Sequence, residues 1–210
     1  FDKKILMMDI GGGSTEYLIG SRGVPDFAIS LKLGAIRLKE RFFHTEPLTV
    51  SQVEQCRKYL TVQLSAVKEE AAARGFELAV GSSGTIETLA AVISGHDEDD
   101  SPPLEATFTA GDLDRAVEHL LSFDTSRKRA KLRGLDDKRS DIIVGGALLL
   151  QESFRVLGIS SMLVSRTALR EGVIRDILLR RNEGSLSADI RRTSIAHLSE
   201  SFHRKGMADA

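Results

Sequence analysis

Residue types that stabilise secreted and membrane proteins are scarce in this sequence. It has one cysteine, Cys56, among 210 residues, so an internal disulfide cannot form and a cytoplasmic location is expected. It has no tryptophan. The longest apolar run, residues 142–150, holds two glycines and is far shorter than the roughly 18 residues of a membrane-spanning helix. These shortages exclude a disulfide-stabilised scaffold and predict no membrane partner.

An excess of charge of one sign is also lacking. The 29 basic and 30 acidic residues give a net charge of -1, so sequence-specific binding of nucleic acid is not expected. A hydrophobic content of 41% is that of an ordinary globular protein with enough chain for a sizeable core. Cys56 lies on an apolar helical stripe and is expected in that core. The five histidines lack the spacing of a metal site and are expected at the surface or in packing contacts: His44, His96, His119, His197 and His203.

Short apolar runs separated by turn residues predict a sheet. Three antiparallel strands are expected over Lys4–Ile10, Thr15–Ile19 and Phe27–Leu33, and two more over Glu77–Val80 and Met162–Val164. Helical spacing of apolar residues predicts helices over Thr49–Arg74, Thr85–Ser94, Gly111–Phe123, Asp137–Leu157, Ala168–Arg181 and Ser187–Arg204. The acidic stretch "HDEDDSPP", residues 96–103, is expected to be a surface loop. The pattern predicts an α/β fold with a mixed five-stranded sheet flanked by helices.

Three consecutive glycines stand between the first two expected strands, in "MDIGGGSTE". One explanation is a tight hairpin turn; the other is a loop that brings bare backbone N–H groups to an anion. Asp9 ends one strand and Glu16 begins the next. Two carboxylates would repel a phosphate unless a hard cation such as Mg²⁺ lay between them. A metal and phosphate site is therefore predicted from Asp9, Gly11, Gly12, Gly13, Ser14 and Glu16, with Asp9 and Glu16 as the metal ligands.

A second corner of the same kind occurs in "VGSSGT", where a short strand is followed by small residues and a helix. The partial positive charge of a helix N-terminus favours phosphate oxygens. The predicted phosphate-binding residues here are Gly81, Ser82, Ser83, Gly84 and Thr85. Two such corners in one domain could face each other.

Basic residues cluster after the expected helix at Gly111–Phe123. The cluster comprises Arg127, Lys128, Arg129, Lys131 and Arg133, and Lys138 and Arg139 follow it. Such a run is often only a solvated face. A polyanion such as polyphosphate would be attracted to it through counterion release, by analogy with nucleic acid.

Five ordered motifs resemble one known family. They are "DIGGGSTE", "LKLGAIRLKERF", "VGSSGTIETLA", "KRSDIIVGGALLL" and "ALREGVIRDIL", and together they are similar to the exopolyphosphatase and guanosine pentaphosphate phosphohydrolase family. The resemblance covers residues 3 to about 181. It implies the ribonuclease-H-like fold of actin, sugar kinases and heat-shock ATPases. The sequence departs from the family at Arg166 and Thr167, which leaves the role of that turn open.

The resemblance also implies residue roles and a domain arrangement. Asp9 and Glu16 match acidic residues associated with Mg²⁺ and the scissile phosphate, and Gly145 and Gly146 match a closely packed helix. Residues 1–183 are expected to be the second domain of such an enzyme, and residues 184–210 a helical extension. The catalytic base is expected in a first domain that the chain lacks. That first domain and a second copy of the chain are the expected protein partners.

Three functions follow as expectations. The first is Mg²⁺-assisted release of terminal phosphate from inorganic polyphosphate or guanosine pentaphosphate, with water attacking in line. An ATP-dependent kinase or ATPase of the same superfamily would share both glycine-rich corners. A non-catalytic sensor of phosphate or of a guanosine alarmone would also use them.

Overall fold

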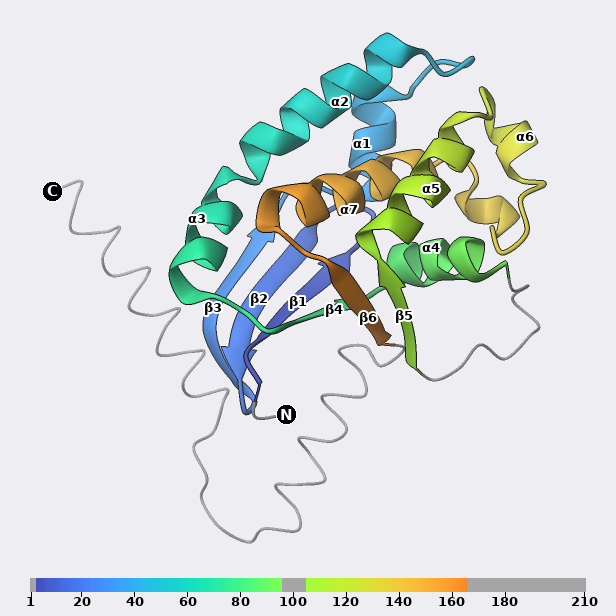
Figure 1. The fold of residues 1–210 in the computed structure, drawn as a ribbon. Helices are drawn as coiled ribbons and strands as arrows, with labels where there is room; N and C mark the ends of the chain where they lie inside the picture. Colours follow the sequence, from blue (N-terminus) through green and yellow to red (C-terminus); the bar gives the residue numbers. More distant parts are fainter. Residues whose placement is uncertain (1–2, 96–104, 166–210) are drawn as a thin grey trace, which may run out of the picture. The chain divides into compact units, whose positions relative to one another are not determined.

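The computed structural model describes residues 3–95 and 105–165, which belong to one unit of the chain. In these residues a six-stranded sheet has the order β3-β2-β1-β4-β6-β5, and Figure 1 shows helices α1 to α5 and α7 gathered over one of its faces. No helix among the residues so described is long and apolar enough to cross a membrane. The expected helices at Ala168–Arg181 and Ser187–Arg204, the acidic loop, and Arg166 and Thr167 lie outside the described residues.

The first half of the sheet is the expected antiparallel set. Strands β1 (Ile5–Ile10), β2 (Thr15–Ser21) and β3 (Val24–Leu31) pair in order. Successive side chains of a strand point to opposite faces of the sheet, so every second residue of β1 faces the helices. Leu6, Met8 and Ile10 are buried under the helices, which leaves Asp9 on the other side of the strand.

The second half of the sheet contains one more strand than expected. β4 (Leu78–Ser82) runs parallel to β1, and β6 (Ser161–Ser165) runs parallel to β4. The additional strand is β5 (Glu105–Thr109), which pairs antiparallel with β6 at the edge of the sheet. The sequence pattern does not predict this strand, because an edge strand of this length is specified by its neighbour more than by its own residues. The α/β class with a mixed sheet is confirmed.

Helices occupy most of the remaining described residues. They are α1 (Ala35–Phe42), α2 (Val50–Gln63), α3 (Ser65–Arg74), α4 (Gly84–Ser94), α5 (Ala110–Leu121), the short α6 (Ser126–Arg129), the 3₁₀ turn η1 (Asp137–Arg139) and α7 (Ile143–Leu157). Four features differ from expectation: α1 and the short α6 are additional, the helix expected over Thr49–Arg74 divides at Leu64, and α7 begins after η1 rather than at Asp137.

Helix α7 lies at the centre of the helical layer and contacts α1, α2, α3, α4 and α5. Its two glycines allow this close packing. A Cβ atom on Gly145 would lie 2.8 Å from the Cβ of Leu38 in α1, and one on Gly146 would collide with Thr85 in α4. The close packing expected of Gly145 and Gly146 is therefore confirmed, and it brings α1 and α4 together under one helix.

The expectations for isolated side chains also hold where the structure describes them. Cys56 is fully buried, and burial raises the pKa of its thiol to about 12. His119 stacks on Phe123 with ring centroids 5.4 Å apart, and His44 is exposed. These residues are structural or solvated and take no part in the site described below.

Truncation of one buried side chain in α7 is expected to show how much the packing of this helix contributes to the free energy of unfolding. Leu148 is 0% exposed in α7, so Leu148→Ala leaves a cavity at the centre of the core. We expect a loss of about 2–5 kcal/mol in the free energy of unfolding, measured by denaturant titration with circular dichroism. The matched control is Val62→Ala, at a side chain that is 67% exposed, and it should change the same quantity by less than about 0.5 kcal/mol. Similar losses in both variants would contradict the central position of α7.

Candidate active site

Two carboxylates meet at the end of the first hairpin. In the register of β1 and β2, Asp9 lies directly opposite Glu16, and paired residues of antiparallel strands project to the same face. Asp9 is half-buried, whereas Glu16 is exposed. The structure thus brings together the two acidic residues that the sequence singled out.

Asp9 is half-buried and accepts a hydrogen bond from a hydroxyl group. Burial raises the pKa of the Asp9 carboxyl, the hydrogen bond from Ser82 opposes this rise, and the negative charge of Glu16 adds to it. Ser82 Oγ donates to Asp9 Oδ2 over 3.2 Å. Ser82 belongs to β4, which lies beside β1, so the second small-residue corner contacts the first carboxylate. The ionised form of Asp9 would be stabilised by a bound cation.

Glu16 is fixed by two serines. Its Oε1 atom accepts hydrogen bonds from Ser14 Oγ at 2.7 Å and from Ser30 Oγ at 2.6 Å. Ser30 lies opposite Glu16 in the register of β2 and β3. Sequence reasoning missed Ser30, because a serine within a strand has no local signal and only the strand register places it beside Glu16. One carboxylate oxygen is therefore held in place, and Oε2 has no hydrogen bond to the described residues.

The glycine loop is more than a tight turn. Gly11 N donates to Ser14 O at 2.9 Å, which closes the hairpin, while the carbonyl oxygens of Gly11 and Gly12 each accept an amide of α1 at 3.0 Å. Gly34 packs so closely on this loop that a Cβ there would lie 2.6 Å from Gly13 N. The loop carbonyls thus cap α1. The amides of Gly12 and Gly13 donate to no residue in the described ranges, which leaves them available to an anion.

Both corners line one cavity. It has a volume of about 540 Å³ and is bounded by the first corner and α1, the second corner, and the segment before α7. Its lining residues are Asp9, Ile10, Gly11, Gly12, Ala35, Ile36, Ser83, Gly84, Thr85, Asp136, Lys138, Arg139 and Ile142. The first turn of α4 is part of this wall, and the first amides of a helix lack acceptors within the helix. The expectation that the two corners face each other is met.

Two cations, Lys138 and Arg139, line this cavity, and neither is among the phosphate-binding residues predicted for the two corners; Arg139 lies closest to the second corner. Its guanidinium lies against the first residue of α4, since a Cβ on Gly84 would be 2.7 Å from Arg139 Cζ and 2.9 Å from Nη1. This side chain forms no hydrogen bond or ion pair with the residues that the structure describes. The sequence did contain a signal for this contact. Gly84 is the first residue of a helix and has no backbone angle that requires glycine, which indicates that another group packs closely against it.

The structure separates the five residues of the predicted basic cluster. Arg129 is 4% exposed, and Lys128 pairs with Asp124 at 2.7 Å. Arg127, Lys131 and Arg133 are exposed. The described residues that line the cavity include none of the five. Attraction of polyphosphate by the exposed members stays a prediction, whereas the position of Arg129 favours a structural role.

The donor set suits a hard cation held loosely by the protein. The described residues contain no group of three or more histidine, cysteine, aspartate or glutamate side chains that could hold a metal ion. Mg²⁺ is commonly bound by one or two carboxylates, with water and substrate phosphates completing its six oxygen ligands. Asp9 lines the cavity, and Glu16 lies opposite it on the next strand, so the two carboxylates fit that requirement.

Comparison with known proteins agrees with this geometry. Residues 1–181 match the model of the Ppx/GppA phosphatase family. Exopolyphosphatase 1 of Mycobacterium bovis is 35% identical over 172 residues, which are 81% of this chain and 50% of that protein. The guanosine-5'-triphosphate,3'-diphosphate pyrophosphatase of Pseudoalteromonas translucida is 27% identical over 198 residues, covering 94% and 38% of the two chains.

Solved structures give the same relationship at the level of the fold. The crystal structure of the Aquifex aeolicus member of the Ppx/GppA family has a TM-score of 0.77 and 29% identity, and the match covers 87% of this chain and 58% of that one. This likeness confirms the expected actin-like ATPase fold. The chain spans about half the length of the first curated relatives that it matches. From its sequence, its fold and the arrangement of its two glycine-rich corners, the chain belongs to the Ppx/GppA phosphatase family.

Proposed function

We propose that this chain provides one wall of a phosphohydrolase site that releases terminal phosphate from inorganic polyphosphate or guanosine pentaphosphate. The observation that carries the proposal is the pairing of Asp9 with Glu16 beside a cavity lined by both small-residue corners. The names of the relatives from Mycobacterium bovis and Pseudoalteromonas translucida support these two substrates. The single cysteine further favours a cytoplasmic enzyme.

The residues of this chain would bind and orient the phosphates. The free amides of Gly12 and Gly13 and the first amides of α4 would donate hydrogen bonds to phosphoryl oxygens, and the guanidinium of Arg139 would neutralise their charge. Asp9 and Glu16 would hold Mg²⁺, which supplies positive charge to stabilise the phosphoryl oxygens in the transition state. The base that takes a proton from the attacking water would lie in a further part of the full-length protein. That part corresponds to the half of the relatives that this chain does not match.

The test is phosphate release by the full-length protein in the presence of Mg²⁺. Polyphosphate and guanosine pentaphosphate are assayed side by side, and ATP is included as a third substrate. Release from either of the first two substrates, abolished by a chelator, is the expected result. Faster turnover of ATP would identify a kinase or ATPase instead, and tight binding of guanosine pentaphosphate without release would identify a sensor.

Removal of one hydroxyl beside Glu16 tests whether a fixed carboxylate matters. Ser30→Ala deletes a hydrogen bond of 2.6 Å to Glu16 Oε1 and leaves that of Ser14. We expect phosphate release to fall about threefold to tenfold, because each hydrogen bond to a charged group is worth roughly 1.5–3 kcal/mol and Ser14 retains part of the constraint. Ser160→Ala, at an exposed serine before β6, is the control. Equal rates in the two variants would show that Ser30 has no part in placing Glu16.

A further inference from the structure

The segment that carries Arg139 has little regular structure of its own. Residues 122–142, here called the connecting segment, join α5 to α7 and contain only α6 and η1 as helical turns. A guanidinium at the end of such a segment would not stay against Gly84 unless the segment were held from outside. Leu135 packs this segment into the core, and the polar contacts of Arg129 and Glu46 fix both of its ends.

Arg129 joins both ends of the connecting segment through one buried side chain. Its Nη1 atom donates to Phe123 O at 2.7 Å, near the start of the segment, and its Nε atom donates to Ser140 O at 3.1 Å, near the end. Ser140 is the next residue after Arg139. Because a planar guanidinium makes these bonds in fixed directions, Arg129 constrains the Ser140 carbonyl and with it the adjoining backbone of Arg139.

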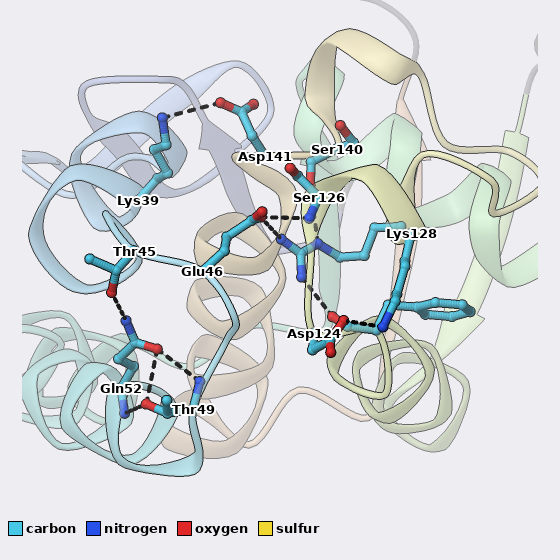
Figure 2. A network of polar contacts seen from close by, with 12 residues as sticks. Lys39, Thr45, Glu46, Thr49, Gln52, Asp124, Ser126, Lys128, Ser140 and Asp141 are labelled. Carbon is cyan, nitrogen blue, oxygen red and sulfur yellow. Dashed lines mark hydrogen bonds and ion pairs between the residues drawn. The ribbon is translucent and has the colours of Figure 1, made fainter.

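Glu46 anchors this arrangement to the connection between α1 and α2. Its Oε1 atom lies 3.4 Å from Arg129 Nη2 and accepts the backbone amide of Ser126 at 2.5 Å. Figure 2 shows the carboxylate of Glu46 facing Ser126. The same view shows the ion pair of Lys39 with Asp141, in which Lys39 Nζ and Asp141 Oδ2 are 3.2 Å apart. Burial lowers the pKa of Arg129, and the charge of Glu46 opposes this change. The connecting segment is therefore held at its start, its middle and its end.

We propose that Arg129 and Glu46 are positioning residues that hold the guanidinium of Arg139 over the N-terminus of α4, ready to bind a phosphate. This inference rests on the proposed function, because it concerns the same cavity. It assigns to Arg129 a different role from the attraction of polyphosphate that the sequence predicted. Glu46, which lies in a loop far from the glycine-rich corners in the sequence, becomes part of the support of the site.

A double-mutant cycle separates positioning from general stabilisation. Binding of inorganic tripolyphosphate to the full-length protein is measured by calorimetry for wild type, Glu46→Gln, Arg139→Gln and the double variant. We expect binding to weaken about threefold in Glu46→Gln and about tenfold in Arg139→Gln. The double variant should be no weaker than Arg139→Gln, since Glu46 has nothing left to position. Glu54→Gln, at an exposed glutamate of α2, should bind as wild type does.

Two results would overturn the proposal. One is additive losses in the double variant, and the other is unchanged binding in Arg139→Gln or in Glu46→Gln. Glu46 is 41% exposed, so Glu46→Gln is expected to fold, which thermal unfolding of the same samples will verify. Arg129→Lys provides a second arm: it keeps the charge but cannot reach three acceptors, and its loss should likewise vanish when Arg139 is also replaced. Phosphate release by wild type, assayed separately, reports on the proposed function and can fail without affecting the binding cycle.

Discussion

Asp9→Asn should lower Mg²⁺-dependent phosphate release by the full-length protein at least about tenfold, which corresponds to about 1.4 kcal/mol of transition-state stabilisation. Asparagine keeps the size of the side chain and its hydrogen bond from Ser82, but removes the negative charge that would hold the metal. The rate is measured at saturating polyphosphate over a range of Mg²⁺ concentrations. We expect the concentration of Mg²⁺ needed for half-maximal rate to rise as well.

The same variant should fold at least as well as wild type. Burial raises the pKa of Asp9, so the folded state binds the proton more tightly than the unfolded state does. The contribution of Asp9 to stability is then greatest below its unfolded pKa and is lost as the pH rises through the folded pKa. At neutral pH without metal, Asp9→Asn should melt at the same or a higher temperature, and this difference should shrink in acid.

A control separates the loss of charge at this site from loss of charge in general. Glu69→Gln removes an exposed carboxylate from α3 and should change neither the rate nor the requirement for Mg²⁺. Wild-type turnover in Asp9→Asn would reject the metal site. An unfolded Asp9→Asn protein would show that this carboxylate supports the fold rather than the chemistry.

Gly84→Ala should weaken binding of inorganic tripolyphosphate about tenfold while changing stability little. The new methyl group would occupy the space of the Arg139 guanidinium, which lies 2.7 Å away measured to Cζ. This end of the arginine is flexible, so it can move into solvent at small cost to the fold. The phosphates then lose one cation, and the dependence of log Kd on log salt concentration should become shallower by about one unit, by analogy with nucleic-acid binding.

A matched glycine is available in another helix. Gly111 also lies in the first turn of a helix, α5, but a Cβ there would be 3.6 Å from the nearest atom, Arg115 Nη1. Gly111→Ala should therefore leave both binding and its salt dependence unchanged. Wild-type binding in Gly84→Ala would show that Arg139 does not contact the phosphates, and equal losses in the two variants would point to a general effect of alanine in the first turn.

The two corners of the site could be predicted because their signals are local. Asp9, the three glycines and Glu16 occupy one hairpin, and a hairpin with a short loop sets its own register. Ser82 to Thr85 follow a short apolar run and begin a helix, which is a pattern readable within a few residues. Among the helices, the apolar spacing of α5 and α7 gave their presence correctly, although α7 begins later than its pattern suggested.

The class of fold and the family could be read from the sequence alone, and so could the neighbouring positions of the acidic and glycine-rich residues. Only the tertiary structure decided that Ser30 holds Glu16, that Arg139 packs on Gly84, and that Arg129 is an interior support rather than a surface cation. Each of these contacts joins residues brought together by strand register or by packing of separate helices. The sequence around a basic or hydroxyl side chain is the same whether that side chain faces water or a buried acceptor. The physical reason is that burial and hydrogen-bond partners depend on the whole fold, whereas glycine corners and apolar periodicity depend on neighbouring residues.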